Sequence, residues 1–192
     1  MQRFLLLFFA ILLNQLVLAS EPSNSPLVLR INGIITSNTL SQIELAVSNW
    51  KNADPIPGGL IVLLDSPGGN GEVAIQIGRL LRKKDAHVFV TGQCESACVF
   101  ILAGGVVRAA NPNSIGVHAG RLTLTNRNGE IIKEIDSSQS LIDSFKLTSF
   151  NSVANQYLSE MGLRNGLIDV MLAHKTIQIG RASCRERVSS PV

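Results

Sequence analysis

Three short segments carry the residue types that acyl-transfer chemistry needs. Ser96 lies in Gly92–Cys98, a run of small residues between the expected strand His87–Thr91 and an apolar helical run. The loop Asp65–Gly69 ends in Pro-Gly-Gly and can present exposed backbone amides, and His118 follows further along the chain. A nucleophile, amides that bind an oxyanion, and a base are the parts of a serine hydrolase site. The sequence therefore predicts such a site.

Each of these residues also has a simpler interpretation. Ser96 could only cap the helix that follows it, which is a common role of serine. His118 ends the apolar stretch Ser114–His118, where a single histidine is usually a structural residue. Gly68 and Gly69 could form an ordinary turn between a strand and a helix. The three parts are far more specific together than separately, because the chemistry needs all of them.

The segments that position these residues alternate between strand and helix patterns. This alternation predicts an α/β fold with a mainly parallel sheet. Arg121–Ile135 contains Asn128-Gly129, which favours a hairpin. The expected strands are Leu27–Ile31, Leu60–Leu64, His87–Thr91 and Ser114–His118. The expected helices are Asn38–Lys51, Gly71–Lys84, Ser96–Ala103 and Leu141–Lys175, the last of them broken around Gly162–Gly166.

The N-terminal end is expected to lie outside the folded domain. Residues 1–20 combine Arg3 with the apolar run Phe4–Leu13, a pattern typical of a cleaved export signal. The mature protein is then periplasmic or secreted, and residues 21–26 form a disordered lead. An uncleaved anchor, which would keep the chain close to a membrane, is the alternative.

The C-terminal end has an unusual composition. Residues 179–192 resemble the in-frame translation of a common short-read sequencing adapter, so residues 27–178 are expected to form the domain, truncated before its natural end. The whole chain of 192 residues has 17 Lys and Arg and 14 Asp and Glu. The two ends hold four of the former and one of the latter, which leaves 13 of each. The domain is therefore near neutral, and its charge is no argument for nucleic-acid binding.

Three motifs in combination resemble the Clp protease proteolytic-subunit family of the Clp/crotonase superfamily. They are Asp65–Gly69, Gly92–Ala97 and Asn111–His118, in this order. The resemblance covers roughly Leu27–Lys175, and is strongest to an exported Clp-like branch with a Cys-x-Ser-Ala-Cys signature. It implies a Clp/crotonase-like spiral of β-β-α units with a mainly parallel sheet. A homo-oligomer is expected from the same resemblance.

The resemblance also implies an activity and its residues. Ser96 would be the nucleophile and His118 the base of a serine peptidase that acts on peptides or proteins. The amides of Gly69 and Ala97 would bind the oxyanion. Export implies that the enzyme is ATP-independent, because an exported chain cannot reach cytosolic ATPase partners.

The third catalytic residue is the least defined part of the site. Asp169 is the nearest match to the aspartate that orients the histidine in the family. Its surroundings differ from the family motif, and an alignment on Gly162 would put Met171 there instead. Asp143 and Asp136 are further candidates, and Asp169 could equally be a surface carboxylate.

Three other functions are compatible with these motifs. Ser114–Val117 also resembles signal peptide peptidase A, in which a Ser–Lys dyad acts, and Lys146 would then be the base if burial lowers its pKa. A non-catalytic Clp-like binding or assembly module would keep the fold without the reaction. A crotonase-like acyl-CoA enzyme would use the same oxyanion loops, although export argues against it because CoA thioesters are cytosolic.

Two cysteines, Cys94 and Cys98, lie on either side of Ser96. In an oxidising compartment they can form a disulfide if their geometry allows, and two buried thiols are the alternative. We expect no metal site, since no further ligands follow at the usual spacing, and no cofactor. The third cysteine, Cys184, lies in the segment attributed to the adapter.

Overall fold

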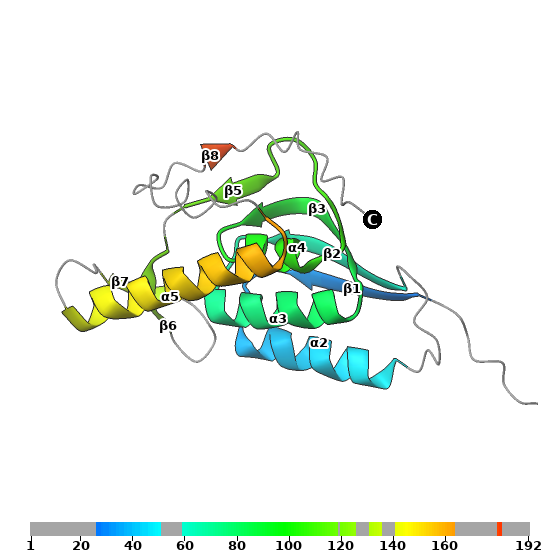
Figure 1. Ribbon diagram of the computed structural model, residues 1–192, viewed down its shortest axis with the longest axis horizontal. Helices are drawn as coiled ribbons and strands as arrows, with labels where there is room; N and C mark the ends of the chain where they lie inside the picture. Colours follow the sequence, from blue (N-terminus) through cyan, green and yellow to red (C-terminus); the bar gives the residue numbers. More distant parts are fainter. Residues whose placement is uncertain are drawn as a thin grey trace, which may run out of the picture.

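The computed structural model of the chain describes residues 26–50, 59–118, 120–125, 131–135, 141–163 and 180–181. Strands and helices alternate along the chain, as Figure 1 shows, which confirms the predicted α/β class. The strands are β1 (Leu27–Asn32), β2 (Leu60–Ser66), β3 (His87–Glu95), β4 (Val107–Ala109), β5 (Ile115–Val117), β6 (Leu122–Thr125), β7 (Ile131–Ile135) and β8 (Gly180–Arg181). The helices are α2 (Ser37–Asn49), α3 (Gly71–Lys83), α4 (Cys98–Gly104) and α5 (Leu141–Glu160).

The main sheet is mostly parallel, as predicted. Its strand order is β1-β2-β3-β5-β8, with β4 also paired to β3, and only the pairing of β5 with β8 is antiparallel. Leu60, Val62 and Leu64 of β2 have no exposed surface, which is typical of a central strand. Because parallel strands end at the same edge of a sheet, the segments after β2, β3 and β5 meet there. β8 pairs only with β5, so the parallel part of the sheet does not include it.

Helices α3 and α4 pack so closely that their backbones touch. Every residue of α4 is buried, and a Cβ on Gly104 would collide with the backbone of Gly78 in α3. A Cβ on Gly78 would in turn lie 2.8 Å from the carbonyl oxygen of Phe100. Glycine is therefore required at this crossing because no side chain fits. Helix α4 begins directly after the Ser96 turn, so this packing anchors the segment that carries Ser96.

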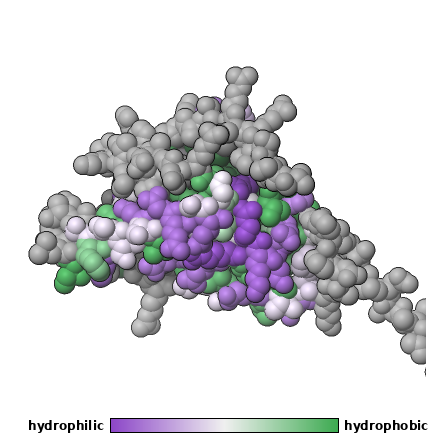
Figure 2. Space-filling view, viewed as in Figure 1, coloured by the Kyte–Doolittle hydropathy of each residue, from purple (hydrophilic) through white to green (hydrophobic). Residues whose placement is uncertain are grey.

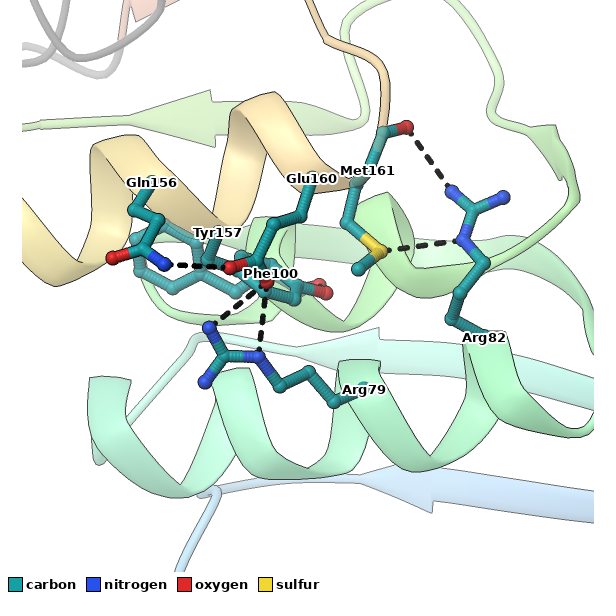
Figure 3. A network of polar contacts seen from close by, with 7 residues as sticks. All are labelled: Arg79, Arg82, Phe100, Gln156, Tyr157, Glu160 and Met161. Atoms are coloured by element: carbon teal, nitrogen blue, oxygen red, sulfur yellow. Dashed lines mark hydrogen bonds and ion pairs between the residues drawn. The ribbon is translucent and has the colours of Figure 1, made fainter.

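The C-terminal end of α5 is attached to α3 and α4 by a network of polar contacts (Figure 3). The Tyr157 hydroxyl donates a 2.7 Å hydrogen bond to the carbonyl oxygen of Phe100. The Arg82 guanidinium donates to the Met161 carbonyl oxygen at 3.1 Å, and Arg108 donates to the same oxygen at 2.7 Å. Two arginines thus satisfy a carbonyl just beyond the end of the helix, where no amide of the same helix can.

Two differences from the expected elements concern the site. β3 continues to Glu95 instead of ending at Thr91, because the Asp65 carboxylate accepts a 2.9 Å hydrogen bond from the Gln93 N–H and holds this polar stretch in the sheet. Helix α4 begins at Cys98 instead of Ser96, since Ser96 and Ala97 form a turn.

The other elements differ in how well the sequence predicted them. The predicted hairpin is present as the antiparallel pair β6 and β7, although its Asn128-Gly129 turn lies outside the described residues. Strand β4 was not predicted, because three residues carry no clear alternation. None of the helices in the described part of the chain is both long and apolar enough to cross a membrane.

Candidate active site

Ser96 lies in the turn between β3 and α4 and has an unusual backbone conformation. Its φ is 53°, a region that residues with side chains rarely adopt. Its N–H donates a 2.9 Å hydrogen bond to the carbonyl oxygen of Gly116, and the residue is half-buried. Ala97 occupies the N-cap position of α4, and no side chain caps the helix. Ser96 therefore does not act as a cap here, and a left-handed backbone at a polar residue is typical of functional sites.

The Pro-Gly-Gly loop packs directly on this turn. Gly68 is buried with a φ of 100°, and a Cβ at this position would lie 2.8 Å from the Cβ of Ser96 and 3.0 Å from the amide nitrogen of Ala97. These distances are too short for any side chain at position 68. The structure thus brings two of the predicted site segments into backbone contact, although they are far apart in sequence.

The direction of the Gly69 amide follows from the geometry of one peptide bond. The Gly68 carbonyl oxygen accepts a 2.8 Å hydrogen bond from the N–H of Ile35, at the end of the sheet where β1 lies. Because the peptide is trans, its N–H points the opposite way, away from Ile35 and toward the side on which β3 lies. Gly69 is exposed. The Gly69 N–H therefore points away from Ile35 and toward the side on which the Ser96 turn lies.

Strand β5 carries His118 to the same edge of the sheet. Gly116 pairs with Glu95, the residue before Ser96, and its carbonyl oxygen binds the Ser96 N–H. His118 follows β5 directly and is half-buried. The nucleophile and base suggested by the sequence are therefore carried on neighbouring strands, one residue after β3 and one residue after β5.

The remaining candidates for the catalytic residues have different outcomes. Asp169, Asp136 and Met171 lie outside the described residues, as does the side chain of Asp143. Lys146 is described, and it is exposed on α5. A lysine base needs burial to lose its charge near neutral pH. The exposure of Lys146 therefore gives no support to a Ser–Lys dyad.

A disulfide links the two cysteines that flank the Ser96 turn. The sulfur atoms of Cys94 and Cys98 are bonded in the structure, and the two Cα atoms are 5.3 Å apart. Neither residue has any exposed surface. The bond therefore joins the end of β3 to the start of α4 beneath Ser96.

Within the described residues, no group of three or more His, Cys, Asp or Glu could hold a metal ion.

Ser66 contacts the site, although the sequence marks it only as part of the motif Asp65–Gly69. Ser66 is the last residue of β2, and its side chain has 1% exposure. Its hydroxyl accepts a 3.1 Å hydrogen bond from the Gly68 N–H. Ser66 continues the alternate buried positions Leu60, Val62 and Leu64 of β2, and a serine in such a series is the sequence signal that could have singled it out.

The fold defined by this sheet and these loops is Clp-protease-like. Among solved structures, the chain is similar to a point mutant of ClpP1 from Listeria monocytogenes, with a TM-score of 0.56 and 17% sequence identity. The similarity covers 74% of this chain and 77% of that chain. No protein-family model and no curated protein matches the chain. At this identity the similarity shows the fold alone, in agreement with the resemblance of the three motifs.

Proposed function

We propose that the chain is an exported, ATP-independent serine peptidase that cleaves peptide bonds through an acyl-enzyme. The observation that carries the proposal is the close packing of Gly68 against Ser96 and Ala97. A serine hydroxyl and two backbone amides close together at one edge of the sheet would suit this reaction. A Clp-protease-like fold supports the same reaction class.

The reaction follows from the roles proposed for these residues. His118 takes the proton of the Ser96 hydroxyl, and the oxygen attacks the carbonyl carbon of a peptide bond. The amides of Gly69 and Ala97 donate hydrogen bonds to the oxyanion of the tetrahedral intermediate. The C–N bond breaks as the imidazolium returns its proton to the leaving amine. Water then attacks the acyl-enzyme with His118 again as base, and the ester C–O bond breaks as the imidazolium returns the proton to the Ser96 oxygen. Loss of one oxyanion donor would slow such a reaction by about a hundredfold.

The location and assembly belong to the same proposal. Residues 1–20 have the pattern of an export signal, and an exported enzyme must act without cytosolic ATPases. Its substrate would be a peptide or a protein outside the cytosol. We also expect a homo-oligomer. Figure 2 shows hydrophobic surface at the end of the molecule where α5 begins, and there Ile142 and Phe145 are 68% and 74% exposed.

A fluorophosphonate probe tests the nucleophile, because it reacts with activated serines. The mature domain should be labelled, while Ser96→Ala and His118→Ala should not. His87→Ala is the matched control, since His87 is half-buried at the opposite end of β3 and its variant should label normally. Labelling that persists in Ser96→Ala, or no labelling of a folded wild-type domain, contradicts the proposal. The second result would favour a non-catalytic module with this fold.

A competition experiment separates a peptidase from an acyl-CoA enzyme. Peptide aldehydes add reversibly to an activated serine, so they should slow the labelling of Ser96. A CoA thioester should not slow it, because the proposed site is built for a peptide carbonyl. Protection by the thioester alone would overturn the assignment to peptidases while leaving Ser96 as a nucleophile.

A further inference from the structure

The Ser66 hydroxyl joins three separate segments of the chain through polar contacts, the longest of which is 3.5 Å to the Gly68 carbonyl oxygen. Its hydroxyl donates to the Gly33 carbonyl oxygen at 2.6 Å, in the turn that follows β1. The same oxygen accepts from the Gly68 N–H at 3.1 Å. A serine hydroxyl has a single proton to donate, and the short contact shows that Gly33 receives it. The Ser66 oxygen is therefore oriented as an acceptor for the loop.

These bonds fix a loop that would otherwise be free to rotate. Gly68 and Gly69 have φ values of 100° and 141°, and glycine has no side chain to restrict it. The Gly68 N–H is held by Ser66, and the Gly68 carbonyl oxygen is held by Ile35. With both polar groups of Gly68 bonded, the orientation of the next peptide plane is set. The N–H of that plane belongs to Gly69.

We propose that Ser66 is a positioning residue that holds the Gly68 peptide so that the Gly69 amide faces the substrate carbonyl. The proposal rests on the proposed function, and it assigns to Ser66 a part in the reaction although its buried hydroxyl never touches the substrate. Donors that are aligned before the reaction stabilise the transition state because no reorganisation is needed when charge develops. Loss of the Ser66 hydroxyl should therefore weaken the stabilisation of the oxyanion in a protein that still folds.

The test compares an activated aryl ester with the matching thionoester, in which sulfur replaces the carbonyl oxygen. Sulfur accepts hydrogen bonds weakly, so the thionoester benefits little from the oxyanion donors. Ser66→Ala should lower kcat/KM for the oxygen ester by about tenfold to a hundredfold, and should change the thionoester much less. Ser114→Ala is the matched control, because Ser114 is also buried, at 5% exposure, and its hydroxyl donates to the Asn111 carbonyl oxygen, outside the loop. For this control, the ratio of kcat/KM for the oxygen ester to kcat/KM for the thionoester should equal the wild-type ratio.

The outcomes separate this proposal from the proposed function. No Ser96-dependent hydrolysis by the wild type overturns both. Normal wild-type hydrolysis with an unchanged rate ratio in folded Ser66→Ala overturns the role of Ser66 alone. If Ser66→Ala does not fold, Ser66→Cys replaces it, since a thiol fills the site but bonds weakly, and its ratio should fall. Ser66→Thr, which keeps the hydroxyl, should restore the ratio, and a loss equal to that of the other variants contradicts the proposal.

Discussion

Gly68 packs so closely against Ser96 that no Cβ fits at position 68. A Cβ on Gly68 would lie 2.8 Å from the Cβ of Ser96 and 2.7 Å from the Glu95 carbonyl oxygen. Gly68→Ala should therefore push the loop away from the turn and reduce fluorophosphonate labelling by about a hundredfold, the effect of a lost oxyanion donor.

Gly162→Ala is the control for this prediction. Gly162 also has a positive φ, of 74°, but no atom lies within 4 Å of the position that a Cβ would take. Its substitution adds backbone strain of about 1–2 kcal/mol without a clash. We expect the variant to be less stable and to label normally. Equal labelling of Gly68→Ala and the wild type would show that the contact is not needed.

The bond between Cys94 and Cys98 should support both stability and activity. It closes a short loop around Ser96, and both residues are fully buried. Replacing both with alanine should lower the free energy of unfolding by about 2 kcal/mol, as expected for so short a loop. It should also slow labelling of Ser96, because the turn is then free to leave its left-handed conformation. Denaturant unfolding and labelling rates measure the two effects.

The state of the two cysteines can be checked independently. Alkylation of the mature protein under denaturing conditions should leave Cys94 and Cys98 unmodified until a reductant is added. Alkylation without reductant would mean that both are thiols, and the double substitution should then cost little.

The only tyrosine of the chain, Tyr157, provides a spectroscopic test of the fold. Burial raises the pKa of Tyr157 far above its ordinary value, while nearby Arg82 and Arg108 act in the opposite direction. In the unfolded chain the tyrosinate absorbance should appear near pH 10, and in the native protein only at higher pH. The native state thus keeps a proton that the unfolded state loses, so this contribution is complete below about pH 10 and decreases as pH rises further. Tyr157→Phe should weaken the alkaline loss of stability, and titration of native Tyr157 near pH 10 would contradict the burial.

The exposed start of α5 should take part in assembly. Phe145→Glu should shift the expected homo-oligomer toward the monomer, because it puts a charge into an apolar contact. Leu45→Glu is the matched control, since Leu45 is 62% exposed on α2, away from α5. Sedimentation at several protein concentrations measures both variants. Identical profiles of Phe145→Glu and the wild type would exclude this part of α5 from the interface.

The sequence made the general arrangement of the site predictable for a physical reason. Gly69, Ser96 and His118 all follow strand segments with clear apolar patterns. Parallel strands end at one edge of their sheet, so the order of strands and loops already indicates which loops meet. In the structure, Gly68 contacts the Ser96 turn, so two of these loops do meet.

Contacts between distant polar residues could not be predicted in this way. The end of β3 was expected at Thr91 because Gly92 and Gln93 interrupt the apolar run, but the Asp65 carboxylate binds the Gln93 N–H across the sheet. The bond from Ser66 to Gly33 likewise joins residues 33 positions apart. Such pairs leave no periodic signal in the sequence, since each depends on where the whole fold brings its partner.

The burial of α4 directly behind Ser96 has a consequence for the history of such a protein. Most substitutions in residues 97–104 would destabilise the folded protein, because this segment has no solvent-facing side. Ser96 is different, since it is half-buried in a turn and an alanine can occupy its place. A lineage that no longer needed the reaction could therefore lose the hydroxyl in one step and keep the scaffold. Such a change would leave related sequences that keep glycine at positions 68, 78 and 104 but lack serine at position 96.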